Sequence, residues 1–201
     1  MKLGMPQLYE FDTIEENLIL AKQLNLDFIE LNLNFGYCRK EMEEGKLFDL
    51  LKKYDIEATL HFYDEADFGL YDEVVNAYLS LLKKYSKLGK GYIKMINVHN
   101  NPGPIVTISG IKNYIYDKEY NEYINRLISN LKKAEEICLE NDIKLVIEGL
   151  DDTYVTKTTY LEEVGSFTKL THVVAEDSTL IDEVNNLINA MTWKTLPEVS
   201  E

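Results

Sequence analysis

Three residues of types that commonly bind metal ions lie near the ends of different segments of β-strand type. They are His61 in residues 57–63, His99 in residues 92–100 and Glu148 in residues 144–150. Burying a carboxylate is costly unless it meets a metal ion, a cation or several hydrogen-bond donors. Histidine and carboxylate together are typical ligands of zinc, manganese or a similar divalent ion. A structural, hydrogen-bonded role is the alternative for each residue alone, but their shared placement favours a metal site.

Other polar residues share this placement. In parallel α/β folds, functional residues gather at the C-terminal ends of the strands. Within residues 27–34, Glu30, Asn32 and Asn34 alternate with apolar residues, so they lie on one face of the predicted strand. Asp177, which follows the last predicted strand, is a weaker candidate. These residues are therefore expected at the same end of the sheet as the histidines.

Segments of strand type and of helix type alternate along the chain. The predicted strands cover residues 2–10, 27–34, 57–63, 92–100, 144–150 and 170–175. After the first strand, Thr13 and Glu16 have the spacing of a capping box, and apolar residues then recur at helical spacing. Similar amphipathic segments follow the later strands, including a short one at residues 159–164. This rhythm requires a parallel sheet with crossover helices and therefore predicts an α/β fold.

Two connections are predicted to be irregular. A loop is expected from Gly36 up to a helix at residues 47–54. Residues 101–104, Asn-Pro-Gly-Pro, form a turn that can continue neither a strand nor a helix. Residues 105–117 then make a long connection, which is expected to be a flap over the strand ends because connections of this length are often functional.

Composition limits the classes of function. The chain has 201 residues, and we predict one domain over residues 1–191 followed by a tail over residues 192–201. Its net charge of −14 disfavours binding to phosphate backbones, and no apolar run approaches the roughly 20 residues that span a membrane. The isolated Cys38 and Cys138 favour free thiols in a reducing cytoplasm. The sequence contains no dinucleotide fingerprint, P-loop or nucleophile elbow.

Five motifs together resemble the xylose-isomerase-like TIM barrels, which include sugar-phosphate isomerases and epimerases and the endonuclease IV type of abasic-site nuclease. The motifs are LGMPQLYEF, FIELNLN, LHFY, INVHNNPG and LVIEGL. The resemblance implies a (βα)8 barrel in which His61 and His99 face the metal site and Glu148 binds a divalent metal ion, Mn²⁺, Zn²⁺ or Mg²⁺. In the epimerase branch, Glu148 would also be one of two carboxylates that move the proton beside the sugar carbonyl.

The sequence departs from the family pattern after the fifth strand. The family's sixth strand ends in Asp followed three residues later by His, whereas Asp177 is followed by Leu180. The family's seventh strand usually brings a histidine and its eighth a glutamate, but a full barrel needs about 250 residues and this chain has about six βα units. We therefore expect a shortened or incomplete barrel. Its open sheet edges would favour either dimerisation, as a homodimer, or instability.

The leading hypothesis from the resemblance is a metal-dependent sugar or sugar-phosphate isomerase/epimerase-like protein of carbohydrate metabolism, with Glu148 as its catalytic residue. The expected metal ligands are Glu148, His99, His61 and Asp177, and the residues expected to bind a small sugar or sugar phosphate are Glu30, Asn34 and His61. One alternative is an endonuclease IV-like abasic-site phosphodiesterase, which the acidic charge disfavours. The other is a catalytically degenerate barrel that binds a small polyol or a partner. A cytoplasmic location is expected, with neither nucleic acid nor membrane as partner.

Overall fold

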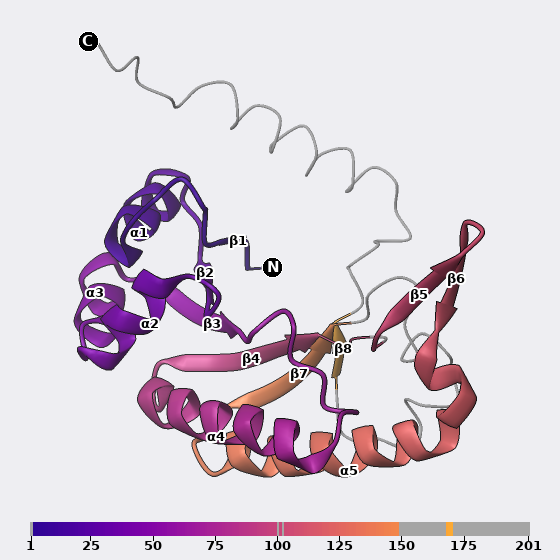
Figure 1. Cartoon of the computed structure of the whole chain (residues 1–201). Coiled ribbons are helices and arrows are strands. Elements are labelled where there is room, and N and C mark those ends of the chain that lie inside the picture. Colours follow the sequence, from indigo (N-terminus) through magenta and orange to yellow (C-terminus); the bar gives the residue numbers. More distant parts are fainter. Residues whose placement is uncertain (1, 100, 102, 149–167, 171–201) are drawn as a thin grey trace. The chain divides into compact units, whose positions relative to one another are not determined.

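A six-stranded sheet organises the chain. The computed structural model describes residues 2–99, 101, 103–148 and 168–170. The strands are β1 (Gly4–Pro6), β2 (Phe28–Asn32), β3 (Glu57–His61), β4 (Ile93–His99), β7 (Lys144–Glu148) and β8 (Thr168–Leu170). Their order in the sheet is β1-β2-β3-β4-β7-β8, and neighbouring strands from β1 to β7 are parallel (Figure 1). The predicted α/β fold with a parallel sheet is therefore confirmed.

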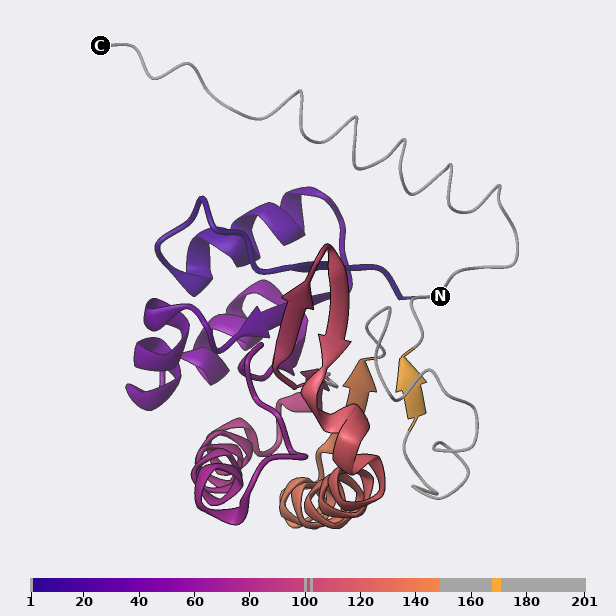
Figure 2. The same ribbon diagram turned by 45° about the vertical axis from the view of Figure 1, so that its right-hand side comes forward.

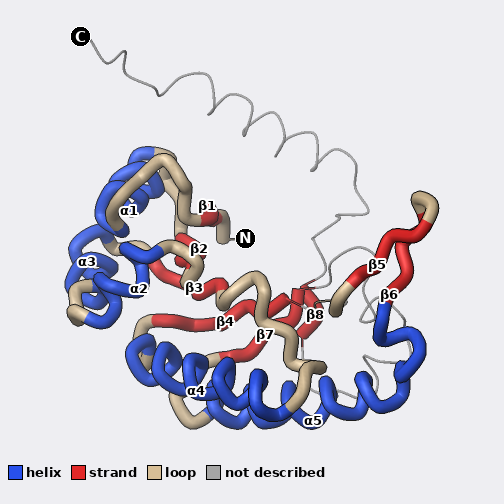
Figure 3. Tube along the Cα trace, in the orientation of Figure 1, coloured by secondary structure: helices blue, strands red, loops and turns tan. Residues whose placement is uncertain are grey.

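Helices connect the strands (Figure 3). They are α1 (Ile14–Gln23), α2 (Gly36–Glu43), α3 (Leu47–Tyr54), α4 (Asp72–Gly89) and α5 (Tyr120–Leu139). The capping box predicted at the start of α1 is confirmed. The Thr13 hydroxyl accepts a hydrogen bond from the Glu16 N–H at 3.2 Å, and the Glu16 carboxylate accepts one from the Asp12 N–H at 3.1 Å. The first bond satisfies a backbone donor that the helix start leaves without a partner, and the second holds the residue before the cap.

The loop predicted from Gly36 is wrong, because helix α2 begins at that residue. Cys38 and Met42 are four residues apart and are both buried, so they form the inner side of this short helix. In the sequence, Gly36 favours a loop. Two apolar residues at helical spacing are too short a pattern to indicate a helix against it. The helix predicted at residues 47–54 is confirmed as α3.

The two faces of the sheet differ in character. On the outer face, alternate strand residues belong to one buried apolar cluster with residues of the helices. These strand residues are Ile29, Leu31, Ala58, Leu60, Ile96, Val98, Leu145 and Ile147. The positions between them point to the inner face, because side chains alternate along a strand. Glu30, His61, Asn97, His99 and Glu148 therefore share the inner face, so folding and chemistry use different positions of the same strands.

A β-hairpin makes up most of the long connection at residues 105–117, and its place as a flap over the strand ends stays a prediction. Its antiparallel strands are β5 (Ile105–Ile108) and β6 (Ile111–Tyr114), and a 3₁₀ helix, η1 (Ile115–Glu119), leads from it into α5. Ser109 and Gly110 both have positive φ angles, 50° and 81°, as a two-residue type I′ turn requires. Figure 2 shows the hairpin as a pair of strands separate from the main sheet.

The ends of the predicted strands need correction. The first strand is shorter than residues 2–10, since β1 covers Gly4–Pro6, and β8 ends at the first residue of the strand predicted at residues 170–175. Residues Met1–Lys169 form one compact unit. The helix predicted at residues 159–164, the domain end at residue 191 and the tail lie outside the described residues. Within the described part, both cysteines are free and no helix has the length and apolar character to cross a membrane.

Candidate metal centre

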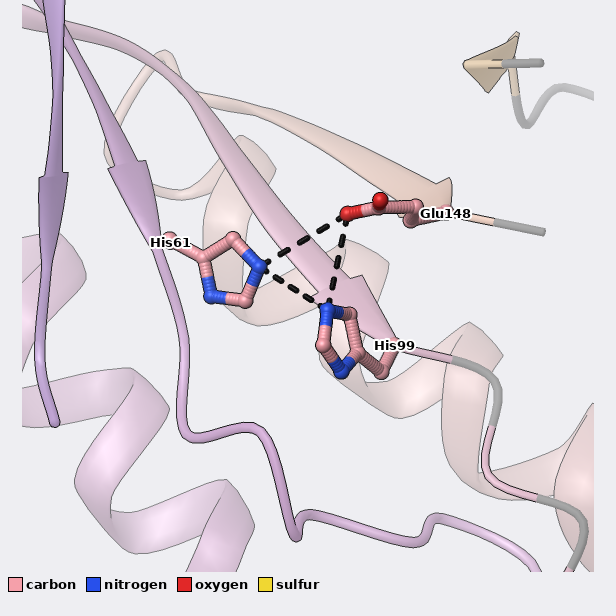
Figure 4. Close-up of side chains that lie close together, drawn as sticks. All are labelled: His61, His99 and Glu148. Carbon is pink, nitrogen blue, oxygen red and sulfur yellow. Dashed lines mark hydrogen bonds and ion pairs between the residues drawn. The ribbon is translucent and has the colours of Figure 1, made fainter. Parts of the chain in front are cut away.

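Three of the predicted ligands lie together at the C-terminal ends of neighbouring strands. His61 ends β3, His99 ends β4 and Glu148 ends β7, and the sheet register pairs His99 directly with Glu148. The Nε2 atoms of the two histidines are 3.0 Å apart. The Glu148 Oε2 atom lies 3.6 Å from His61 Nε2 and 3.5 Å from His99 Nε2 (Figure 4). The alternation of the strands thus directs all three side chains to one point.

The hydrogen bond at the far side of His61 fixes which nitrogen can bind an ion. His61 Nδ1 lies 2.8 Å from the Phe62 carbonyl oxygen, which can only accept a hydrogen bond. The proton of a neutral His61 ring therefore lies on Nδ1, and Nε2 keeps its lone pair. The contact between His61 Nε2 and His99 Nε2 then requires the proton of His99 on its Nε2 atom. A metal ion that replaced the proton on His99 Nε2 could bind the lone pairs of both Nε2 atoms, one from each ring.

Electrostatics keep the carboxylate ionised. The His61 and His99 rings, which favour the charged carboxylate most when they are protonated, and the Asn97 amide outweigh the burial of Glu148 and hold the pKa of its carboxyl well below the usual range. Burial opposes the charged form of His61, but the Glu148 carboxylate and the Phe62 carbonyl outweigh it, so the pKa of His61 is raised. A divalent ion binds the ionised carboxylate and the neutral imidazole, so it would displace the proton that the raised pKa favours on His61.

Asn97 belongs to this group although we did not select it from the sequence. Its Nδ2 donates a hydrogen bond to Glu148 Oε2 at 2.7 Å, and its side chain is 5% exposed. Its Oδ1 is buried and has no hydrogen-bond partner among the described residues. Asn97 precedes His99 by two residues in β4, so the same two-residue alternation that singled out Glu30 and Asn34 could have identified it.

The remaining predicted residues have different positions. Glu30 is on the inner face of β2, and burial raises the pKa of its carboxyl, while His61 and Asn97 act in the opposite direction. Asn34 is exposed in the turn after β2, where its carbonyl accepts a hydrogen bond from Arg39 at 3.2 Å. No contact joins Asn34 to the His–Glu group within the described part of the chain. Asp177 lies outside the described residues.

The donor set suits a metal ion. One ligand atom from each of His61, His99 and Glu148 can be chosen so that all lie within 4.8 Å of one another. In a tetrahedral zinc site, ligand atoms about 2.0–2.1 Å from the ion are about 3.3 Å apart. The three separations of 3.0, 3.5 and 3.6 Å lie close to that value. The three side chains therefore have the chemistry and the spacing of one face of such a site.

Comparison with solved structures identifies the architecture. The chain is similar to a D-tagatose 3-epimerase-like protein, with a TM-score of 0.60 and 17% identity over 83% of this chain and 60% of that one. It is also similar to a xylose isomerase domain protein from Alicyclobacillus acidocaldarius, with a TM-score of 0.59 and 13% identity over 84% and 61% of the two chains. The fold is that of the xylose-isomerase-like TIM barrels. The resemblance expected from the five motifs is therefore confirmed at the level of fold.

The chain is shorter than the proteins to which its fold is similar. It spans about 60% of the length of the D-tagatose 3-epimerase-like protein and of a D-psicose 3-epimerase. The chain spans more of a 3-keto-D-glucoside 4-epimerase from E. coli. That match has a TM-score of 0.61 and 15% identity over 92% of this chain and 74% of the epimerase. No protein-family model and no curated protein sequence matches the chain. The structural neighbours include several sugar epimerases, and the likeness to them is one of fold.

Proposed function

We propose that this chain is a metal-dependent sugar or sugar-phosphate isomerase/epimerase-like protein, in which His61, His99 and Glu148 hold the metal ion. The observation that carries the proposal is the convergence of these three ligand atoms at the C-terminal end of a xylose-isomerase-like sheet. Active sites of TIM barrels lie at that end. The structural neighbours include a D-tagatose 3-epimerase-like protein, a D-psicose 3-epimerase and an L-ribulose 3-epimerase, and these names support a small sugar as the substrate class.

The proposed roles follow from the charge state of each group. A divalent ion would polarise the carbonyl oxygen of a sugar and make the neighbouring C–H more acidic. Glu148 is better suited to bind the ion than to accept that proton, because a carboxylate with a strongly lowered pKa is a weak base. Glu30, with a raised pKa, is the better matched proton acceptor and would also bind substrate hydroxyls. Asn97 would hold the Glu148 carboxylate in place.

The first test is metal binding. Protein dialysed against Zn²⁺ or Mn²⁺ should contain one ion per chain by elemental analysis, and Glu148→Gln should lose it. Mutation of a residue that only supports a metal ligand lowers metal affinity by about 10–100-fold. Removal of a ligand itself should therefore lower the affinity by at least as much. Glu140→Gln is the control, because Glu140 is an exposed carboxylate after α5. Wild-type protein that binds no ion would overturn the proposal.

The second test is turnover. A panel of ketoses and ketose phosphates is incubated in D₂O with Mn²⁺, and deuterium incorporation beside the carbonyl is followed by NMR. Exchange is expected with the wild type and with Glu140→Gln, and it should be lost in Glu148→Gln. Exchange that persists in Glu148→Gln would remove Glu148 from the reaction. Wild-type protein that holds an ion but exchanges no member of the panel would favour binding without turnover, the degenerate barrel that we consider as an alternative.

A second candidate is phosphodiester cleavage at abasic sites, as in the endonuclease IV branch. The observation that favours it is the pair of imidazoles, since two nitrogen ligands beside one carboxylate suit zinc. The net charge of −14 opposes it, because nucleic-acid-binding surfaces are usually basic. Cleavage of a duplex that contains one abasic site, compared between wild type and His99→Gln, separates the two candidates.

A further inference from the structure

Tyr123 joins the two segments that leave the histidine-bearing strands. It lies on α5, its side chain is fully buried, and its hydroxyl oxygen is 2.7 Å from the Asn101 carbonyl and 3.0 Å from Asp67 Oδ1. Asn101 follows His99 by two residues, and Asp67 lies in the connection between His61 and α4. One hydroxyl group therefore contacts the chain just after β4 and the chain just after β3.

The Asn101 side chain makes the same connection in the other direction. Its Nδ2 donates hydrogen bonds to the carbonyl oxygens of Asp64 at 2.8 Å and Ala66 at 2.9 Å. Asp64 Oδ1 is 3.4 Å from His61 Nδ1, so this stretch of chain reaches the ring of the first histidine. The exits of β3 and β4 are thus joined by a closed set of hydrogen bonds through Asn101, Tyr123 and Asp67.

Helix α5 supports this set along one of its faces. Arg126 Nε donates to the Gly69 carbonyl at 2.9 Å, and Asn130 Nδ2 donates to the Phe68 carbonyl at 3.0 Å. These residues follow Tyr123 by three and seven positions, which places them on the same face of the helix. Gly69 gives the Tyr123 ring its space, because a Cβ atom at residue 69 would overlap that ring.

Counting protons shows how the hydroxyl can make both contacts. A phenol has one proton and a carbonyl oxygen has none, so Tyr123 can donate either to Asn101 or to Asp67. If Tyr123 donates its proton to the Asn101 carbonyl, its contact with Asp67 can be a hydrogen bond only when Asp67 is protonated. The Asp67 carboxyl group then donates to the Tyr123 oxygen. Burial raises the pKa of Asp67, which favours this protonated form. Both contacts then hold together in the interior, where an unmade hydrogen bond is costly.

We infer that Tyr123 is a positioning residue that fixes the spacing of His61 and His99 by joining the exits of β3 and β4 through its hydroxyl group. The inference rests on the proposed metal site, because a fixed spacing of 3.0 Å between two ring nitrogens matters most for an ion that both must reach. The Tyr123 hydroxyl bonds to Asn101 and Asp67, so its proposed effect on the histidines passes through these two residues.

The test compares Tyr123→Phe with Tyr78→Phe. The first variant keeps the ring and removes the hydroxyl that joins the two exits. The second removes a hydroxyl that donates to the Glu65 carbonyl at 3.3 Å, on the exit of β3. In metal-free protein, the ¹⁵N and ¹H signals of both the His61 and His99 rings should shift in Tyr123→Phe and stay unchanged in Tyr78→Phe. The affinity for Zn²⁺ should fall about 10–100-fold in Tyr123→Phe, which is the usual loss when a residue that orients a metal ligand is mutated.

The outcomes separate the inference from the function on which it rests. Wild-type protein that binds no Zn²⁺ overturns the metal site, while the ring signals still report on the role of Tyr123. A folded Tyr123→Phe with unchanged ring signals and unchanged Zn²⁺ affinity overturns the inference. If Tyr123→Phe does not fold, Asn101→Ala removes the bonds to Asp64 and Ala66 from a half-buried position. Unchanged signals of both rings in that variant would also overturn the inference.

Discussion

Glu148 illustrates how a single carboxylate is kept charged inside a protein. Its Oε2 atom faces His61 Nε2, His99 Nε2 and Asn97 Nδ2, and these groups offset the desolvation cost of its position. The contact with the Asn97 amide is the shortest of the three, at 2.7 Å. Its role can therefore be measured separately from that of the histidines.

Asn97→Asp should destabilise the metal-free protein. The substitution replaces a donor to Glu148 by a second carboxylate, and the loss of a hydrogen bond to a charged group costs about 2 kcal/mol. Urea unfolding in the presence of EDTA measures the change, and Asn76→Asp on the exposed side of α4 is the control. An unfolding midpoint of Asn97→Asp equal to that of the control would show that the hydrogen bond from the amide to Glu148 contributes nothing to stability.

Asp67 should make stability depend on pH in the opposite sense to an ordinary ion-paired carboxylate. Its native pKa is raised by burial above the ordinary value of 3.8, so the folded state binds more protons than the unfolded state. Stability should therefore fall as the pH rises from about 4 through the native pKa of Asp67 and then level off. Asp67→Asn should lack this fall. Urea unfolding between pH 4 and 8 compares the two proteins, and parallel curves would contradict the prediction.

At the scale of elements, the alternation of strand residues accounts for what the sequence could predict. From the sequence alone, it indicates that Glu30, His61, His99 and Glu148 share one end of the sheet. It does not show that the Asn97 amide reaches Glu148, because that bond joins neighbouring strands whose register depends on tertiary packing. The same alternation predicts Asn34 beside the site, but it holds only within a strand, and Asn34 is exposed in the turn after β2, which ends at Asn32.

The connections are harder to predict than the strands. The hairpin over residues 105–114 depends on the two-residue turn Ser109-Gly110, a weaker pattern than Asn-Gly, and its strands are four residues each. The sequence pattern assigns no role to Tyr123, because its helical spacing fits an ordinary buried position. Its polar contacts join segments 22 and 56 residues away, which local sequence patterns do not report.

Gly69→Ala should disturb the packing of α5 against the exit of β3. The added Cβ would overlap the Tyr123 ring, and such overpacking typically costs about 1–3 kcal/mol. Gly36→Ala is the matched control, since a Cβ there would make an ordinary contact of 3.8 Å with Arg39 at the start of α2. Thermal unfolding measures both. A Gly69→Ala protein as stable as Gly36→Ala would show that the ring can move aside without cost.

At the scale of the whole molecule, the sheet and the charge act in opposite directions on self-association. β1 is the last strand at one end of the described sheet, and an unpaired edge favours pairing with another chain. The net charge of −14 makes two copies repel each other. The two effects can be separated because salt screens the repulsion and leaves backbone pairing nearly unchanged.

The predicted homodimer should therefore depend on salt. Sedimentation of the full chain at about 20 mM and about 300 mM NaCl is expected to show a larger dimer fraction at the higher concentration, where the Debye length is shorter. The monomer mass is 23.3 kDa, so the two species are well separated. A monomer at both salt concentrations, at protein concentrations up to about 100 µM, would contradict the homodimer expected from the open edges.

The separation of the two sheet faces also has a consequence for how the sequence can change. In a deep mutational scan, neighbouring positions of one strand should fail for different reasons. Substitutions at outer positions such as Leu60 and Val98 should reduce protein abundance and should recover at lower growth temperature, since they weaken the core. Substitutions at His61 and His99 should abolish metal binding, and cooling should not restore it, because the ligand itself is lost. Rescue by cooling would then oscillate with a period of two residues along β3 and β4, and a plot of rescue against position would trace the inner face directly.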